Sequence, residues 1–166
     1  VTIMARTRNE IEPLADQIGA YAVPVDVGDP ASVEAAFMAA GYHAAWHGQK
    51  TYNGVALLAR EPVQAVVKNI PGFEDEQARV ITGTVKGVRV IGGYFPNGQA
   101  PESDKFAYKM RWLDALRDWV GSQMQQHPNL VLLGDYNITF DELDMWDPVG
   151  LKDTIHCTVA EREKLQ

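Results

Sequence analysis

Residues 130–138 read Leu-Val-Leu-Leu-Gly-Asp-Tyr-Asn-Ile, and this stretch decides the fold class. The aliphatic run before Gly134 is typical of an inner β-strand, since strands buried on both faces carry near-continuous apolar residues. Asp135 and Asn137 follow at the carboxyl end of the strand, one residue apart. Because extended chain repeats every two residues, both side chains are expected to point the same way, out of the end of the sheet.

A carboxylate beside a carboxamide suits one kind of chemistry. The carboxylate of Asp135 offers a hard anionic oxygen, and the amide of Asn137 both donates and accepts hydrogen bonds. Such a pair fits Mg²⁺ and a phosphate that gains charge during attack. The alternative is an Asx turn that closes the strand, which is the more common origin of an isolated Asp-x-Asn.

Length and composition limit the classes of protein to which this chain can belong. The chain has 166 residues, 46% of them hydrophobic, which is enough for a domain with its own core. No apolar run approaches the roughly 18 residues that span a bilayer, so no membrane partner is expected. The single cysteine, Cys157, excludes an internal disulfide framework, and a cytoplasmic location is the expectation. Because the chain starts at Val1 and not at Met, we expect a fragment or an unusual start.

The net charge of −7 speaks against a protein whose whole surface clamps DNA nonspecifically, because neutralising phosphates requires Lys and Arg. It leaves room for an enzyme that meets nucleic acid through a local patch and a metal.

The first 40 residues alternate between strand and helix patterns. We predict strands at Val1–Ala5 and Tyr21–Val27, and helices at Asn9–Ile18 and Ala31–Ala39. A β-α-β-α order favours parallel strands joined by crossover helices. Near residues 37–41 the sequence pattern changes from alternating strands and helices to short β-type runs. We therefore place a boundary between segments 1–37 and 38–166.

The second segment predicts a mixed sheet with helices packed on it. Its β-type runs are Tyr42–Trp46, Gly54–Ala59, Val63–Lys68, Arg79–Val85 and Val88–Phe95. Lys86-Gly87 is a hairpin signal between the last two runs. Ser103 is expected to cap a helix through about Gln126, whose apolar residues recur every three or four positions. After Asp141 the chain is loop-rich and acidic until a weak helix at Val159–Leu165.

A second polar cluster lies in GGYFPNG (92–98), at the end of a predicted strand. Paired glycines permit close backbone approach, and Pro-Asn-Gly favours a turn. If this strand neighbours the one before Asp135, then Tyr94 and Asn97 converge with Asp135 and Asn137 on one edge. The alternative is a loop tyrosine beside ordinary turn residues.

Three other kinds of residue carry weaker signals. Arg79, at a strand start, would contact a phosphate or, more usually, brace the site through an ion pair. The four histidines have no metal-ligand spacing and are expected to be structural or on the surface. Cys157 has no partner motif and is expected to be inert.

Five ordered segments together resemble the exonuclease III family of the endonuclease/exonuclease/phosphatase superfamily. They are GQKTYNGVALLAR (48–60), FEDEQARVI (73–81), GYFPNGQ (93–99), KMRWLDALRDWV (109–120) and LLGDYNI (132–138). The resemblance covers about residues 38–166. It implies an α/β fold that is part of a four-layer α/β sandwich, with two packed sheets flanked by helices.

The resemblance also implies an activity and its residues. The family hydrolyses phosphodiesters with Mg²⁺, or Mn²⁺ in its place, acting as a monomer on double-stranded DNA at abasic sites or 3′ ends. By this resemblance Tyr94, Asp135 and Asn137 are catalytic, and Asp135 and Asn137 belong to the metal site. Asn97 and Arg79 match positions that support the site or touch DNA.

Parts of the family pattern are absent. Residues 1–37 lack the metal-site Asn and the Glu that is the principal Mg²⁺ ligand, and the Asp-His pair expected near the carboxyl terminus is missing. Residues 1–37 instead resemble part of a short-chain dehydrogenase, where Arg6 would favour NADP and Asp26 would lie near adenine. The glycine-rich turn and catalytic residues of that fold are absent too.

We therefore expect an incomplete nuclease with impaired turnover, fused to a dehydrogenase-like piece. The alternatives are a noncatalytic chimera and, with less support, an NADP-binding module.

Overall fold

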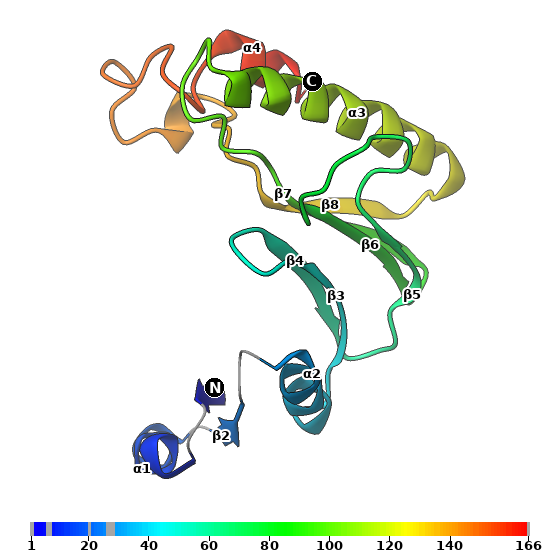
Figure 1. Cartoon of the computed structure of the whole chain (residues 1–166), viewed down its shortest axis with the longest axis vertical. Helices are drawn as coiled ribbons and strands as arrows, with labels where there is room; N and C mark the ends of the chain where they lie inside the picture. The colour runs from blue at the N-terminus through cyan, green and yellow to red at the C-terminus, as the bar shows by residue number, and fades with distance from the viewer. Residues whose placement is uncertain (1, 6–7, 20, 26–28, 166) are drawn as a thin grey trace. The chain divides into compact units, whose positions relative to one another are not determined.

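The computed structural model describes residues 2–5, 8–19, 21–25 and 29–165. Its elements are β1 (Thr2–Ala5), α1 (Arg8–Ile18), β2 (Tyr21–Pro24), α2 (Pro30–Ala39), β3 (His43–Gly48), β4 (Gly54–Ala59), β5 (Gln64–Lys68), β6 (Val80–Val85), β7 (Val88–Tyr94), α3 (Asp104–Gln126), β8 (Leu130–Asp135), the 3-10 turn η1 (Glu142–Asp144) and α4 (Val159–Glu163) (Figure 1). The predicted α/β class is confirmed. The NADP contacts expected of Arg6 and Asp26 lie outside the described residues.

The chain divides into two compact units. The first comprises residues 1–44 and 58–62, and the second comprises residues 45–57 and 63–166. In the first unit β1 and β2 pair in parallel, with Thr2 opposite Tyr21, which confirms the predicted parallel arrangement. No helix within the described ranges is long and apolar enough to cross a membrane.

The second unit is built on a four-stranded sheet in the order β5-β6-β7-β8. Strands β6 and β7 are antiparallel and joined by Lys86-Gly87, both with positive φ (48° and 79°), as a two-residue hairpin of type I′ requires. Strands β7 and β8 are parallel, and helix α3 makes the crossover between them. The predicted hairpin and helix are thus confirmed.

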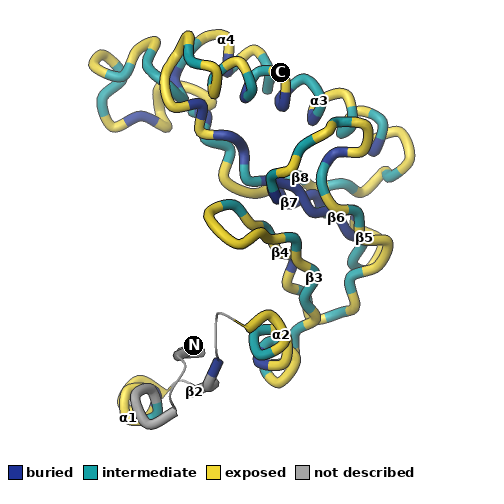
Figure 2. Tube along the Cα trace, viewed as in Figure 1, coloured by how far each residue is buried: buried dark blue, intermediate teal, exposed yellow. Residues whose placement is uncertain are grey.

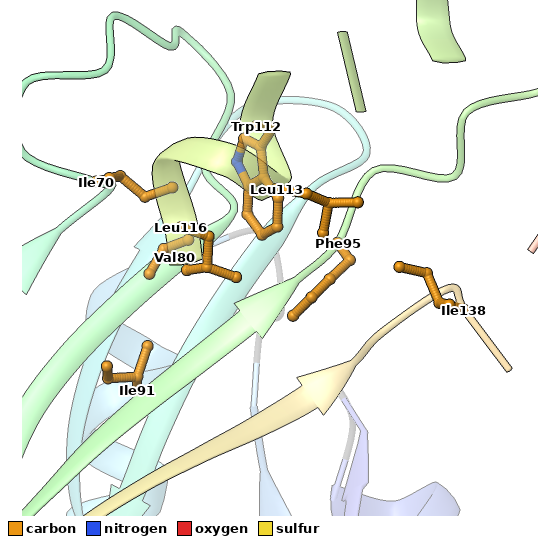
Figure 3. Packing of buried hydrophobic residues seen from close by; sticks show 8 residues of the cluster. All are labelled: Ile70, Val80, Ile91, Phe95, Trp112, Leu113, Leu116 and Ile138. Atoms are coloured by element: carbon orange, nitrogen blue, oxygen red, sulfur yellow. The ribbon is translucent and has the colours of Figure 1, made fainter. Parts of the chain in front are cut away.

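Helix α3 packs on one face of this sheet and closes the main core (Figure 1). The cluster consists of Ile70, Val80, Ile91, Phe95, Trp112, Leu113, Leu116 and Ile138 (Figure 3). Phe95 meets the edge of Trp112 at 5.0 Å between ring centroids, a favoured aromatic geometry. Burial in this unit is deepest along β6 and β7 (Figure 2). Because Phe95 directly follows Tyr94, the core also anchors the end of β7.

Strand β8 differs from the prediction of an inner strand. Within the described residues it pairs with β7 alone and ends the sheet. Leu130 and Leu132 pack against the core beneath α3, whereas Val131 and Leu133 are 38% and 45% exposed. An apolar run favours a strand that is buried on both faces, but strand order and the cover over each face are tertiary properties that the run does not encode.

Ser103→Ala is expected to destabilise the second unit by about 1 kcal/mol, because Ser103 caps the longest helix. Its Oγ accepts the Phe106 N–H at 3.1 Å and lies within hydrogen-bond distance of the Gly98 and Ala100 carbonyls. Urea unfolding followed by circular dichroism measures the loss. Ser122→Ala is the matched control, since the Ser122 hydroxyl donates to the Trp119 carbonyl inside the same helix and caps no helix end. Equal effects of the two changes would contradict the capping role.

Candidate active site

The carboxyl ends of β7 and β8 bring Tyr94 and Asp135 side by side. The two residues are register partners in the parallel pair. The Phe95 N–H donates to the Asp135 carbonyl at 2.9 Å, and the Tyr94 N–H donates to the Arg79 carbonyl at 2.8 Å. Parallel strands end at the same edge of a sheet, so these bonds fix a tyrosine and a carboxylate as neighbours there. The sequence argument depended on the condition that these two strands are neighbours, and they are.

Asn137 reaches this edge by a different route from the one predicted. The chain leaves the extended conformation after Asp135, and Asn137 has a positive φ of 47°. Its N–H donates to Asp135 Oδ1 at 3.0 Å, and its Nδ2 donates to the Phe95 carbonyl at 3.0 Å. The period-two argument is therefore wrong for Asn137: an Asx turn places it, and its amide is tied back to β7.

The Asx turn does not use up the functional groups of the pair. Asp135 is exposed, and its Oδ2 takes no part in the turn. Asn137 is partly buried, and its Oδ1 takes no part in the hydrogen bond that its Nδ2 donates to Phe95. The bond to the Phe95 carbonyl fixes which way this amide oxygen points. The turn thus presents one carboxylate oxygen and one oriented amide oxygen.

The five predicted site residues line two cavities that share no lining residue. Tyr94, Asn97 and Arg79 line one of about 580 Å³, together with Lys105 and Tyr108 among others. Asp135 and Asn137 line another, of about 410 Å³, which also includes His156. The structure therefore joins the two groups through the strand register and not through a single cavity.

Arg79 braces Tyr94 from inside the fold. It is only 9% exposed, and its guanidinium donates to Gln77 Oε1 at 2.6 Å and to the Tyr94 carbonyl at 3.2 Å. The same group lies 5.3 Å from the centre of the Tyr94 ring, within cation–π range. The bracing role is the one favoured from the sequence, but its partners are an amide and a carbonyl and not a carboxylate.

Asn97 forms a second Asx turn at the end of β7. Its Oδ1 accepts the Gln99 N–H at 3.0 Å, and its carbonyl lies 3.3 Å from Lys109 Nζ. The side chain therefore shapes the loop that leads into α3. Asn97 has the accepting role in this turn, as Asp135 has in the turn after β8.

Lys109 and Glu161 belong to this region and were missed from the sequence. Both side chains are fully buried, and Lys109 Nζ lies 2.5 Å from Glu161 Oε1 and 2.6 Å from the Asn137 carbonyl. Burial lowers the pKa of Lys109, and the nearby carboxylates of Glu161 and Asp135 oppose that shift. The sequence does contain a signal for the burial of Lys109. This residue precedes Trp112, Leu113 and Leu116 by three, four and seven positions, which puts it on the apolar face of α3.

Two further side chains carry perturbed acidities. Burial, and then the hydrogen bond to Asp75 at 2.7 Å, raise the pKa of the Tyr108 phenol, so this group stays protonated. Burial, and then the nearby Lys109, lower the pKa of His156. His156 Nε2 is buried and has no hydrogen-bond partner among the described residues. Burial and Lys109 thus disfavour the charged form of this imidazole, which lines the cavity of Asp135.

The donor set at this edge fits a loosely held Mg²⁺. Within the described ranges no three or more His, Cys, Asp or Glu side chains gather into a metal-binding group. Mg²⁺ is nevertheless commonly held by one or two carboxylates, with water and substrate phosphates completing its shell. Asp135 Oδ2 and the Asn137 amide oxygen supply that minimum.

A family comparison agrees with this geometry. The sequence model of the Endonuclease/Exonuclease/phosphatase family matches residues 9–155. The chain belongs to this family. The match begins inside the segment that resembles a dehydrogenase, so that resemblance and the division into segments 1–37 and 38–166 stay predictions.

Individual members of the Endonuclease/Exonuclease/phosphatase family are similar over part of their length. Exodeoxyribonuclease III of Haemophilus influenzae is 32% identical over 111 residues, which cover 63% of this chain and 42% of that protein. An exodeoxyribonuclease of Bacillus subtilis is 30% identical over 125 residues, covering 74% of this chain and 49% of that protein. The chain thus spans about half the length of the curated relatives that it matches.

Several solved structures share the fold. The 3′-5′ exonuclease NExo of Neisseria meningitidis superposes with a TM-score of 0.80 at 37% identity, covering 99% of this chain and 68% of that one. A structure of NExo from Neisseria, described as a 3′ phosphatase bound to a product DNA hairpin, gives the same TM-score at 36% identity, covering 99% of this chain and 68% of that one. An AP endonuclease from Archaeoglobus fulgidus, 23% identical over 98% of this chain and 67% of that one, has a TM-score of 0.72 and supports the fold alone.

Proposed function

We propose that this chain carries a divalent-metal-dependent phosphodiesterase centre of the DNA repair nucleases, with Mg²⁺ as the ion. Its substrate is double-stranded DNA at abasic sites or 3′ ends. The observation that carries the proposal is the register pairing of Tyr94 with Asp135, beside an Asn137 amide tied to the same strand end. The names of the family members, which include exodeoxyribonucleases, support a DNA substrate.

Each of the five residues has its own role in the proposed reaction. Asp135 would hold the cation, and its exposed carboxylate takes up the proton of the water that attacks the phosphorus. The P–O bond to the leaving sugar oxygen breaks in the same displacement, and that oxygen takes a proton from solvent. The Asn137 amide oxygen would help to hold the cation, while the second hydrogen of its Nδ2 and the Tyr94 hydroxyl donate to the phosphate oxygens, where negative charge grows in the transition state. Bound Mg²⁺ would supply a positive charge that stabilises the same oxygens. Arg79 keeps Tyr94 in place, and Asn97 shapes the cavity that receives the backbone of the DNA.

Asp135 is the carboxylate at the strand end, and Asp144 lines the same cavity. With so few acidic ligands, we propose that the metal is bound weakly and turnover is slow. The described part of the chain offers no cluster of three or more potential ligands, in line with that proposal. Millimolar Mg²⁺ and enzyme in excess over substrate are therefore the right conditions for an assay.

An incision assay tests the proposal. The chain is incubated with a 5′-labelled duplex that contains one abasic site, in Mg²⁺ or in EDTA, and an intact duplex is the control. A single metal-dependent cut at the abasic site is expected, and a duplex with a recessed 3′ end reports exonuclease action. No product above background at stoichiometric enzyme would reject the activity and favour a noncatalytic chimeric protein.

The dehydrogenase-like origin of residues 1–37 gives the remaining alternative. An NADP-binding module would use Arg6 and Asp26, which lie outside the described residues. Titration with NADPH, followed by tryptophan fluorescence, tests that alternative. A saturable change would support it, and a flat titration would retire it.

A further inference from the structure

We infer that Lys109, held by Glu161, is a positioning residue that clips the turn at Asn97 to the turn at Asn137. Through these turns the pair sets the relative placement of Tyr94 and Asp135. The inference rests on the proposed nuclease function for its kinetic consequence, but its structural content can be tested without any activity.

The ammonium group of Lys109 makes contacts to three separate parts of the fold. It lies 3.3 Å from the Asn97 carbonyl, beyond β7, and 2.6 Å from the Asn137 carbonyl, beyond β8. Its third contact, at 2.5 Å, is with the Glu161 carboxylate on α4. An ammonium carries three hydrogens, so these three acceptors satisfy it completely. One atom on α3 therefore fixes the distance between the loops that follow the two strands of the site.

Glu161 is in turn held by the loop that precedes α4. Its Oε1 accepts the His156 N–H at 3.2 Å, and its Oε2 accepts the Thr158 N–H at 3.1 Å and the Thr158 hydroxyl at 2.7 Å. The Thr158 hydroxyl also accepts the Glu161 N–H, which completes a capping box. The carboxylate that orients Lys109 therefore has little freedom of its own.

The same loop is tied to the chain just beyond Asn137. The His156 carbonyl accepts the Thr139 N–H at 2.8 Å and lies 3.1 Å from the Thr139 hydroxyl. Arg162 on α4 donates to the Thr139 carbonyl at 3.1 Å. The two ends of the segment from Asn137 to Glu161 are thus held close together, and Lys109 contacts both of them.

A role in positioning explains why an ion pair is buried here. Replacing a buried ion pair by apolar residues is often neutral or even stabilising, so stability alone gives little reason to keep one. Apolar side chains cannot donate to carbonyls, however, and the Asn97 and Asn137 carbonyls point into the fold at Lys109. Because Lys109 is fully buried, it acts through those backbone groups and does not touch substrate.

The decisive variant is Lys109→Met with Glu161→Gln, which removes both charges and keeps similar side-chain lengths. The first readout is the amide ¹H–¹⁵N spectrum without metal or DNA. We expect the Asn97, Gly98 and Asn137 signals to shift or broaden, while those of β5 and β6 stay in place. Lys164→Met is the matched control, since Lys164 pairs with Asp114 at 2.6 Å in a partly exposed site.

The second readout is single-turnover incision of the abasic duplex. We expect the maximal rate to fall about 10- to 100-fold, as a misplacement near 1 Å can cause, with the DNA concentration for half-saturation changed less than about threefold. The control should keep the wild-type rate. If wild type itself shows no incision, the proposed function fails, and the spectra still decide the inference.

A second variant covers the case in which the double variant does not fold. Lys109→Arg keeps the charge for Glu161 but replaces a compact ammonium by a planar fork. It is expected to fold and to move the Asn97 and Asn137 signals together. Unmoved signals and a wild-type rate in whichever variant folds would overturn the inference.

Discussion

Replacing Asp135 by Asn should lower Mg²⁺-dependent incision at an abasic site by at least about 100-fold, the usual scale for losing a group that takes up a proton in the reaction. This substitution removes the negative charge of the side chain and leaves its shape nearly unchanged. Asp135 Oδ1 accepts the Asn137 N–H at 3.0 Å, and the amide oxygen of an asparagine can accept the same bond. The turn should therefore persist, while the anionic oxygen that would hold the cation is lost.

The matched control is Asp29→Asn. Asp29 Oδ1 accepts the Ala31 N–H at 3.1 Å, so it makes the same kind of bond to a residue two positions on, but in the other unit of the chain. Single-turnover rates and thermal unfolding are measured for both variants. The control should keep the wild-type rate. Equal rates for wild type and Asp135→Asn, with both folded, would show that any incision observed does not come from this site.

The elements of the second unit were largely predictable because each has a local cause. The Ser103 cap, the three- and four-residue apolar spacing of α3 and the Lys86-Gly87 turn are all encoded within a few residues. The edge position of β8 was not, because it depends on which strands lie beside it. No pattern within residues 130–135 contains that information.

In the candidate site, too, features with a local cause could be predicted and features that depend on tertiary packing could not. That polar residues follow two strands could be seen in the sequence, and the parallel pairing of β7 with β8 brought Tyr94 to Asp135. The left-handed backbone of Asn137 could not be foreseen from strand periodicity, which fails once the strand ends. Lys109 was missed because lysine is rarely fully buried, and only the carbonyls that gather around it explain why it is.

Gly134→Ala should be the most damaging single-methyl change in the second unit. Gly134 lies directly opposite Gly93 in the parallel pair. A Cβ at Gly134 would stand 1.8 Å from the Gly93 carbonyl oxygen, which is backbone and has no other rotamer to adopt. The residue also has a φ of +142°, a conformation that residues with a side chain avoid.

Overpacking and backbone strain each cost about 1–3 kcal/mol, so we expect a loss of about 3 kcal/mol in the free energy of unfolding. Urea unfolding followed by circular dichroism and tryptophan fluorescence measures it. Gly121→Ala on α3 is the control, because its Cβ would meet nothing within 4 Å and the helix should gain about 0.5–1 kcal/mol.

The position of Gly134 makes its variant a test of the site as well. Movement of β8 away from β7 would relieve the clash and would separate Asp135 from Tyr94. Incision should then fall even under conditions where the variant remains folded, since the two strand ends no longer present their groups to one phosphate. A folded Gly134→Ala protein with wild-type stability and wild-type rate would contradict the register on which the proposed function depends.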